Sequence, residues 1–212
     1  MEHSRSDAQP SEPGSAEDRA APRFTLLIRA AKLVAPQGQF VCVIRDVSAT
    51  GVSLRGFHPL PASEPLAVEL QSGERHAVER VWERGMDSGY RFHEPVEVTH
   101  LISESGDYPR RQVRVDIDKT VYVRSTGQTI EARLTNLSQQ GARIECPYLL
   151  AIGQPLRLIA DDLPDISAKV RWREGRRFGL VFDTTFNLRE LALLVAGLQC
   201  PELLREQPHG LG

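Results

Sequence analysis

The sequence predicts a mainly β protein with two tandem six-stranded antiparallel β-barrels and a C-terminal α-helix. Three features lead to this fold class. Short β-prone runs return at roughly eight-to-twelve-residue spacing with Gly or Pro between them, which is typical of small antiparallel barrels and sandwiches. The pattern of the first half returns in the second half at an offset of 90 residues. Beyond Phe182 the apolar spacing becomes helical.

Length and composition limit the classes of protein that the chain can represent. Its 212 residues and 41% hydrophobic content leave room for two small domains with buried cores. The formal net charge of −2 argues against general nucleic-acid binding, which requires a basic surface. Residues 101–190 are nevertheless net +2, with twelve Arg and two Lys. An anionic ligand is therefore expected to bind in the second half.

The cysteines and the apolar runs indicate the compartment. Cys42, Cys146 and Cys200 include no CxxC pair, which fits neither a disulfide framework nor a zinc cluster. The longest apolar run, residues 191–198, is too short to span a bilayer, and the N-terminus lacks an apolar core of signal-peptide length. We expect a cytoplasmic protein without membrane insertion.

The first half reads as a tail followed by strands and turns. Residues 1–21 are rich in Ser, Pro, Ala, Glu and Asp and have no large apolar residue after Met1, so a disordered tail is expected. Residues 36–39 are a turn signal between two β-prone runs, and further breaks are expected at 46–51 and 72–73. The β-prone runs before the first turn are residues 24–28 and 32–34, and those after it are 40–44, 52–54, 66–70, 76–83 and 89–92.

The second half repeats this plan without a gap. Nine identities relate residues 46–92 to the positions 90 residues later, and Asp46 faces Asn136 as a near match. Unrelated β-domains rarely share so many positions in one register, so we interpret the chain as a tandem duplication. The identical pairs are Ser48/Ser138, Gly51/Gly141, Leu60/Leu150, Pro65/Pro155, Leu66/Leu156, Trp82/Trp172, Gly85/Gly175, Gly89/Gly179 and Phe92/Phe182.

A helix is expected after the second barrel. Asn187 is placed to act as its N-cap with Glu190 at the third helical position, and Pro201 should end it. Its apolar stripe fits a lid packed on the second barrel or a partner-binding or dimer surface. The expected division is a disordered tail (1–21), a first barrel (22–97), a second barrel (98–190), and a C-terminal helix and tail (191–212, the helix starting near 187).

A cluster of polar residues in the second half has the chemistry of a ligand site. Arg110, Arg111 and Arg114 precede its first strand, and guanidinium groups stack on purines, grip phosphates and pair with guanine. Asn136 offers a donor and an acceptor to a base edge. Ser138 adds a hydroxyl, and Gly141 permits a tight turn or a close approach. Together these residues predict a site for a purine nucleotide.

Other groups in the sequence have ordinary structural interpretations. An Arg-rich pentad alone is most often a solvated surface, and Asn-x-Ser-x-x-Gly alone is an ordinary turn. Trp82 and Trp172 are interpreted as barrel core or rim rather than ligand platforms. The six histidines have no metal-binding spacing, and no nucleophile has a plausible base. We therefore expect neither a metal nor an enzyme.

These motifs resemble those of the PilZ domains, which bind the second messenger cyclic di-GMP. The resemblance rests on RxxxR (Arg110, Arg114), on [D/N]xSxxG (Asn136, Ser138, Gly141) and on the closing strands 170–172 and 178–182. It implies a six-stranded barrel on whose surface the arginines clamp phosphates and guanines while Asn136 and Ser138 hold one guanine. It also suggests Arg111 as a further contact. Arg143 would reach the same face if its strand alternates, although a solvated strand arginine is the plainer interpretation.

The first half resembles the same domain with a degenerate ligand loop. It keeps Asp46, Ser48 and Gly51, but Ala20 and Phe24 stand 90 residues before the two motif arginines. Arg19 and Arg23 form an RxxxR pentad that is displaced by one residue. These five retained residues (Arg19, Arg23, Asp46, Ser48, Gly51) define a second, weaker candidate site; the alternative is a purely structural barrel that docks on its twin.

The resemblance implies a non-catalytic cyclic di-GMP receptor of the kind that regulates bacterial motility or biofilm formation. It would use no cofactor and would signal by rearranging its two barrels or a protein partner. The competing interpretation is a PilZ-like adaptor that binds proteins but no nucleotide. Binding of single-stranded nucleic acid is disfavoured by the 6% aromatic content and the balanced charge.

Overall fold

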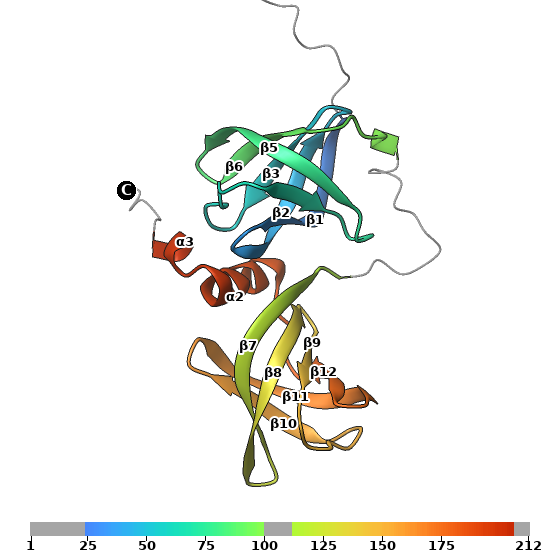
Figure 1. Ribbon diagram of the computed structural model, residues 1–212, viewed down its shortest axis with the longest axis vertical. Helices are drawn as coiled ribbons and strands as arrows, with labels where there is room; N and C mark the ends of the chain where they lie inside the picture. The colour runs from blue at the N-terminus through green and yellow to red at the C-terminus, as the bar shows by residue number, and fades with distance from the viewer. Residues whose placement is uncertain (1–23, 100–111, 206–212) are drawn as a thin grey trace, which may run out of the picture.

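The computed structural model describes residues 24–99 and 112–205, with side chains described from residue 29 onward. Two closed six-stranded antiparallel barrels are stacked along the long axis of the molecule, and a helix lies between them (Figure 1). The predicted fold class is therefore confirmed. The expected disordered tail at 1–21 lies outside the described residues.

The first barrel closes because its first strand pairs with two others. The register of β1 with β2 runs from Phe24↔Val47 to Ala35↔Gly38, and Leu33↔Val68 lies in the pairing of β1 with β4. The order around the barrel is β1-β2-β3-β6-β5-β4. Its strands are β1 (Phe24–Ala35), β2 (Gly38–Val47), β3 (Gly51–Gly56), β4 (Leu66–Glu69), β5 (Arg75–Arg84) and β6 (Asp87–Phe92).

The second barrel has the same topology. Its order β7-β8-β9-β12-β11-β10 reproduces that of the first barrel, and β7 begins 90 positions after β1. Closed barrels leave no free sheet edge, so each half satisfies its own backbone hydrogen bonds. The strands are β7 (Arg114–Ser125), β8 (Gln128–Ser138), β9 (Gly141–Glu145), β10 (Pro155–Ala160), β11 (Leu163–Glu174) and β12 (Arg177–Phe182).

Helix α2 (Leu188–Gln199) begins where the sequence predicts. Asn187 accepts a hydrogen bond from the backbone of Glu190, whose side chain accepts one from the backbone of Asn187, so the capping box is complete. A short helix, α3 (Glu202–Arg205), follows Pro201.

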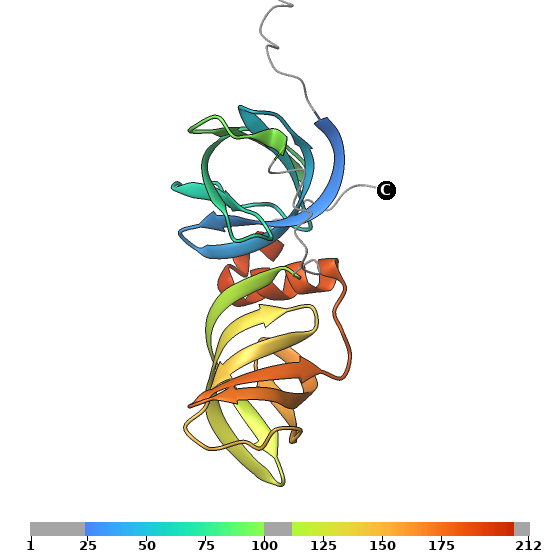
Figure 2. The same cartoon turned by 90° about the vertical axis from the view of Figure 1, so that its right-hand side faces the viewer.

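Helix α2 packs on both barrels. Leu191, Ala192 and Val195 belong to the second core, whereas Ala196 and Cys200 belong to the first. Figure 2 shows the helix crossing the space between the barrels. It is thus a lid on the second barrel, as one interpretation expected, and also part of the wall of the first.

The two tryptophans do not belong to either core. Trp82 and Trp172 are 47% and 41% exposed, so of the two expected positions, core or rim, the core is excluded. Each indole instead lies over the glycine that faces it in the neighbouring strand. A Cβ on Gly89 or Gly179 would lie 2.0 or 1.9 Å from the Nε1 atom of its tryptophan. The Trp and Gly positions that the two repeats share therefore make the same surface contact, once in each barrel.

The described part of the chain contains no helix long and apolar enough to cross a membrane. Cys42, Cys146 and Cys200 are free thiols and all are buried. Burial raises the pKa of the Cys42 thiol to about 12, which keeps it protonated at neutral pH.

Candidate functional site

The Asn-x-Ser-x-x-Gly motif connects two neighbouring strands of the second barrel. Asn136 and Ser138 end β8, and Gly141 opens β9. The Ser138 hydroxyl is buried and donates to the carbonyl of Gly141 at 3.0 Å. The equivalent Ser48 donates to the carbonyl of Gly51 at 3.3 Å. Ser138 therefore shapes the turn, and its hydroxyl is already engaged.

Gly141 is required by a close backbone approach. A Cβ at this position would lie 2.1 Å from the carbonyl oxygen of Leu180, well inside contact distance. Since β9 pairs with β12 through Gly141↔Val181, any larger residue would push these strands apart.

Asn136 presents an unpaired acceptor. Its side chain is 7% exposed and its Nδ2 donates to Asp116 Oδ1 at 3.0 Å. Its buried Oδ1 has no hydrogen-bond partner among the described residues. Leaving a buried amide oxygen unpaired costs about 1–3 kcal/mol, so such an atom marks a place where a donor is missing.

Arg143 lies beside Asn136 on the same outer face. The two residues are cross-strand partners in the β8–β9 ladder. Arg143 Nε donates to Thr135 Oγ1 at 3.1 Å, and its guanidinium lies 4.0 Å from Asp116 Oδ1. The structure thus brings Arg143 to the motif face rather than leaving it as an isolated strand arginine.

Of the three candidate arginines that precede the second barrel, Arg114 is within the described part of the chain. It is exposed, begins β7 and pairs with Ser138 across the β7–β8 ladder. Arg110 and Arg111 lie outside the described residues, so the structure leaves their predicted contacts untested. Arg114 itself therefore lies at the end of the barrel that carries Asn136 and Ser138.

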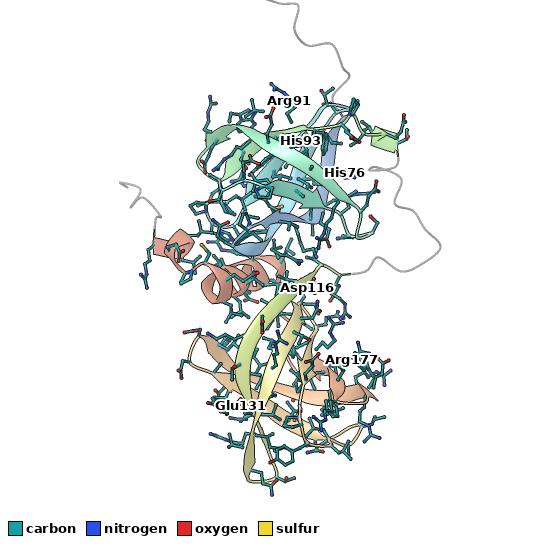
Figure 3. All side chains as sticks on the ribbon, in the orientation of Figure 1. His76, Arg91, His93, Asp116, Glu131 and Arg177 are labelled. Carbon is teal, nitrogen blue, oxygen red and sulfur yellow. The ribbon has the colours of Figure 1, made fainter. Side chains whose placement is uncertain are left out.

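Sequence reasoning missed Asp116, which lies at the centre of this face. It is the cross-strand partner of Asn136 and binds it through Oδ1. Figure 3 shows Asp116 on β7 at the end of the second barrel that faces the first. A signal for it existed: Asp116 lies two residues beyond Arg114, and alternate residues of a strand share a face.

A cleft of about 250 Å³ opens where the two barrels meet at this face. Asn136, Arg114 and Asp116 line its second-barrel side. Lys32 and the turn at residues 70–73 line its first-barrel side. The candidate site is therefore bordered by both barrels, which a motif search in one repeat does not reveal.

The corresponding face of the first barrel has different chemistry. Asp46 accepts a hydrogen bond from Ser53 at 3.0 Å, and Ser53 occupies the position of Arg143. Ser48 and Gly51 form the same turn as their counterparts, and Arg19 and Arg23 lie outside the described residues. The described part of this second candidate site therefore contains a carboxylate and a hydroxyl where the other has an amide and a guanidinium.

The first barrel also contains a larger cavity of about 570 Å³. It is lined by His76 and His93, labelled in Figure 3, and by Glu74, Glu94 and Glu97. These carboxylates disfavour an anionic ligand. No group of three or more potential metal ligands is found in residues 24–99 and 112–205.

The fold and the site define a class: a protein of two closed six-stranded barrels with a polar, arginine-bearing face at their junction. Residues 108–199 match the family model described as the PilZ domain. The match covers the second barrel and helix α2, which is less than half of the chain.

Solved structures that match the chain include three bacterial proteins. PlzA of Borreliella burgdorferi in complex with c-di-GMP is 13% identical, with 89% of this chain and 96% of that chain covered and a TM-score of 0.32. YcgR of Escherichia coli in complex with c-di-GMP is 12% identical (84% and 87% covered, TM-score 0.36). The Bacillus subtilis inhibitor of motility MotI/DgrA is 16% identical (86% and 100% covered, TM-score 0.35). A search of curated proteins found no match.

Proposed function

We propose that the chain is a non-catalytic receptor for cyclic di-GMP whose site lies on the second barrel. The match of residues 108–199 to the PilZ domain model supports this function. The observation that carries it is the buried, unpaired Oδ1 of Asn136 beside two arginines, Arg114 and Arg143. The proposed ligand-binding residues are Arg110, Arg111, Arg114, Asn136, Ser138, Gly141 and Arg143.

The chemistry of the ligand matches these groups. The Watson–Crick edge of guanine carries N–H donors, and one of them would satisfy the acceptor of Asn136. Guanidinium groups bind phosphate bidentately and stack on purine rings, so the arginines suit the rest of the dinucleotide. Signalling would follow because the site borders the barrel junction, and a ligand with different affinities for two barrel arrangements shifts their populations.

Calorimetric titration with cyclic di-GMP tests the proposal. Charge-assisted hydrogen bonds contribute about 1.5–3 kcal/mol, so Arg114→Ala should weaken binding by about tenfold or more. The matched control is Arg124→Ala, because Arg124 is an exposed arginine of the same strand near its other end. The control should bind like the wild type. Absence of binding by the wild type, or equal binding by both variants, would refute the proposal.

A protein-binding adaptor is the second candidate, and one surface feature favours it. Tyr148, Leu149 and Ile152 are 62%, 76% and 70% exposed on the loop between β9 and β10. In the matching loop of the first barrel the counterpart of Tyr148 is His58, which is fully buried. Exposed apolar clusters often mark protein interaction sites. An adaptor would give no calorimetric signal with the nucleotide and would bind its partner equally well with and without it.

A further inference from the structure

Lys32 of the first barrel fixes the backbone at the start of the second. Its side chain is buried, and its ammonium contacts three acceptors: Glu69 Oε1 at 2.5 Å, Gln39 Oε1 at 3.0 Å and the carbonyl oxygen of Arg114 at 2.8 Å. An ammonium has three N–H donors, so all of them are used. Because a buried charge is costly unless paired, this arrangement holds the carbonyl of Arg114 in one place.

Gln39 makes the second connection, and it uses both ends of its amide. Its Nε2 donates to Asp116 Oδ2 at 3.1 Å, and its Oε1 accepts from the backbone N–H of Asp116 at 3.0 Å. The backbone of Gln39 is itself held by helix α2, since Gln199 Oε1 accepts from its N–H and Gln199 Nε2 donates to its carbonyl. Helix α2 therefore fixes the backbone of Gln39, and the side chain of Gln39 binds Asp116.

Asp116 connects Gln39 of the first barrel to Asn136 of the candidate site. Its Oδ2 is held by Gln39, and its Oδ1 accepts from Asn136 Nδ2. With Nδ2 engaged in this way, the amide of Asn136 is oriented so that Oδ1 remains as the unpaired acceptor. The side chain of Asp116 is 60% exposed, so any one of these hydrogen bonds alone would hold it weakly. The hydrogen bonds from Gln39 and Asn136 therefore act together to hold Asp116.

We propose that Gln39 and Lys32 of the first barrel are positioning residues for the nucleotide site of the second barrel, acting through Asp116 and the carbonyl of Arg114. The inference rests on the proposed function. The first barrel thus fixes the orientation of Asn136 and the backbone of Arg114 before the ligand arrives, which lowers the cost of ordering them. By linkage, a ligand bound to Asn136 stabilises the barrel junction to the same extent.

The substitution Gln39→Met tests the proposal, because Met has a similar length and cannot make either bond to Asp116. Gln37→Met is the matched control: Gln37 belongs to the turn before β2 and donates to Ser63 of its own barrel. Calorimetry with cyclic di-GMP should show at least tenfold weaker binding by Gln39→Met and unchanged binding by Gln37→Met. Thermal melting of both variants checks that they are folded.

A second readout separates positioning from a general structural effect. A fixed Asn136 acceptor favours guanine, which has adjacent N–H donors on its edge, over adenine, which has an acceptor beside its amino group. The preference for cyclic di-GMP over cyclic di-AMP should therefore shrink in Gln39→Met. A folded Gln39→Met variant with wild-type affinity and wild-type preference would overturn the inference and leave the proposed function intact.

Hydrogen exchange of the wild-type full chain keeps the inference testable even if Gln39→Met does not fold. Cyclic di-GMP should slow exchange of the amides in residues 32–41 of the first barrel, because binding stabilises the junction. Binding by calorimetry without added protection there would also overturn the inference. Absence of any binding by the wild type would refute the proposed function and, with it, this inference.

Discussion

Gly141 and Gly179 of the second barrel are both buried, but they lie against different kinds of neighbour. An added Cβ on Gly141 would meet the rigid backbone of Leu180, whereas one on Gly179 would meet the indole of Trp172, an exposed side chain able to turn away. Glycine is therefore required at the two positions for different reasons. The backbone of Leu180 leaves no room for a side chain at Gly141, whereas the movable side chain of Trp172 occupies the space beside Gly179.

Gly141→Ala is expected to be strongly destabilising, because β9 must move away from β12 to accommodate the methyl group. Overpacking of this kind costs about 1–3 kcal/mol or more. Gly175→Ala is the control: its φ is +60° in open space, so it has only backbone strain, about 1 kcal/mol. Urea denaturation measures both. Equal losses of stability in the two variants would contradict the close-approach explanation.

His58 gives the first barrel a dependence on pH. It is fully buried, its Nδ1 lies 2.7 Å from the carbonyl oxygen of Pro59, and burial lowers its pKa below the ordinary 6.5. The folded state therefore keeps the imidazole neutral while the unfolded chain takes up a proton near pH 6.5. Stability is full above that pH and is lost as the pH falls through 6.5 toward the lower folded-state pKa.

The free energy of unfolding should consequently fall between pH 7.5 and 5.5, and the fall should be smaller in His58→Phe, which keeps a ring against Phe40. Urea denaturation at the two pH values gives the comparison. His93→Phe serves as the control, because His93 is exposed. An unchanged pH dependence in His58→Phe would show that another group is responsible.

The sequence of β2 contains a signal of the packing between the barrels. Residues 39–44 are all buried, although a barrel strand normally alternates between inside and outside. The outward Val41 packs in the core of the second barrel, which explains the uninterrupted apolar run. Such a run in a small barrel indicates a strand covered on both faces.

Helix α2 shows what local patterns determine and what they leave open. Its start, its capping box and its helical spacing follow from neighbouring residues, so they were predicted. The surface on which the helix packs could not be predicted, since a lid and a partner surface require the same apolar stripe. The contact of Gln199 with Gln39 joins residues 160 positions apart, and no local pattern indicates such a pair.

The site was predictable to the same limited extent. Asn136, Ser138 and Gly141 are close in sequence and form one turn, and strand alternation brought Arg143 to the same face. Asp116 was available from alternation but was not named. Lys32 and Gln39 come from the other barrel and look like ordinary strand residues in the sequence, so only the packed structure reveals them.

At the scale of the whole molecule, the two barrels share their cores through α2 and Val41. Disruption of one barrel exposes apolar surface of the other, so the two should unfold together. The chain offers one tryptophan per barrel to test this. Trp172→Phe leaves Trp82 to report on the first barrel, and Trp82→Phe leaves Trp172 to report on the second.

Fluorescence melting curves of these two variants should show one transition each, and the midpoints should agree after correction for any shift in overall stability measured by circular dichroism. Adding Leu134→Ala, a cavity in the second core that costs about 2–5 kcal/mol, should lower the midpoint reported by Trp82 as well. A midpoint for Trp82 that does not respond to Leu134→Ala would show that the barrels unfold independently.

The position of α2 also bears on the order in which the chain is made. Ala196, Cys200 and Leu203 complete the core of the first barrel, yet the ribosome adds them after every strand of the second barrel. During translation the first barrel emerges first but lacks part of its wall until nearly the last described residue has been added. Its final packing therefore has to wait for the synthesis of α3, and the barrel whose strands are made first is completed after the strands of the second.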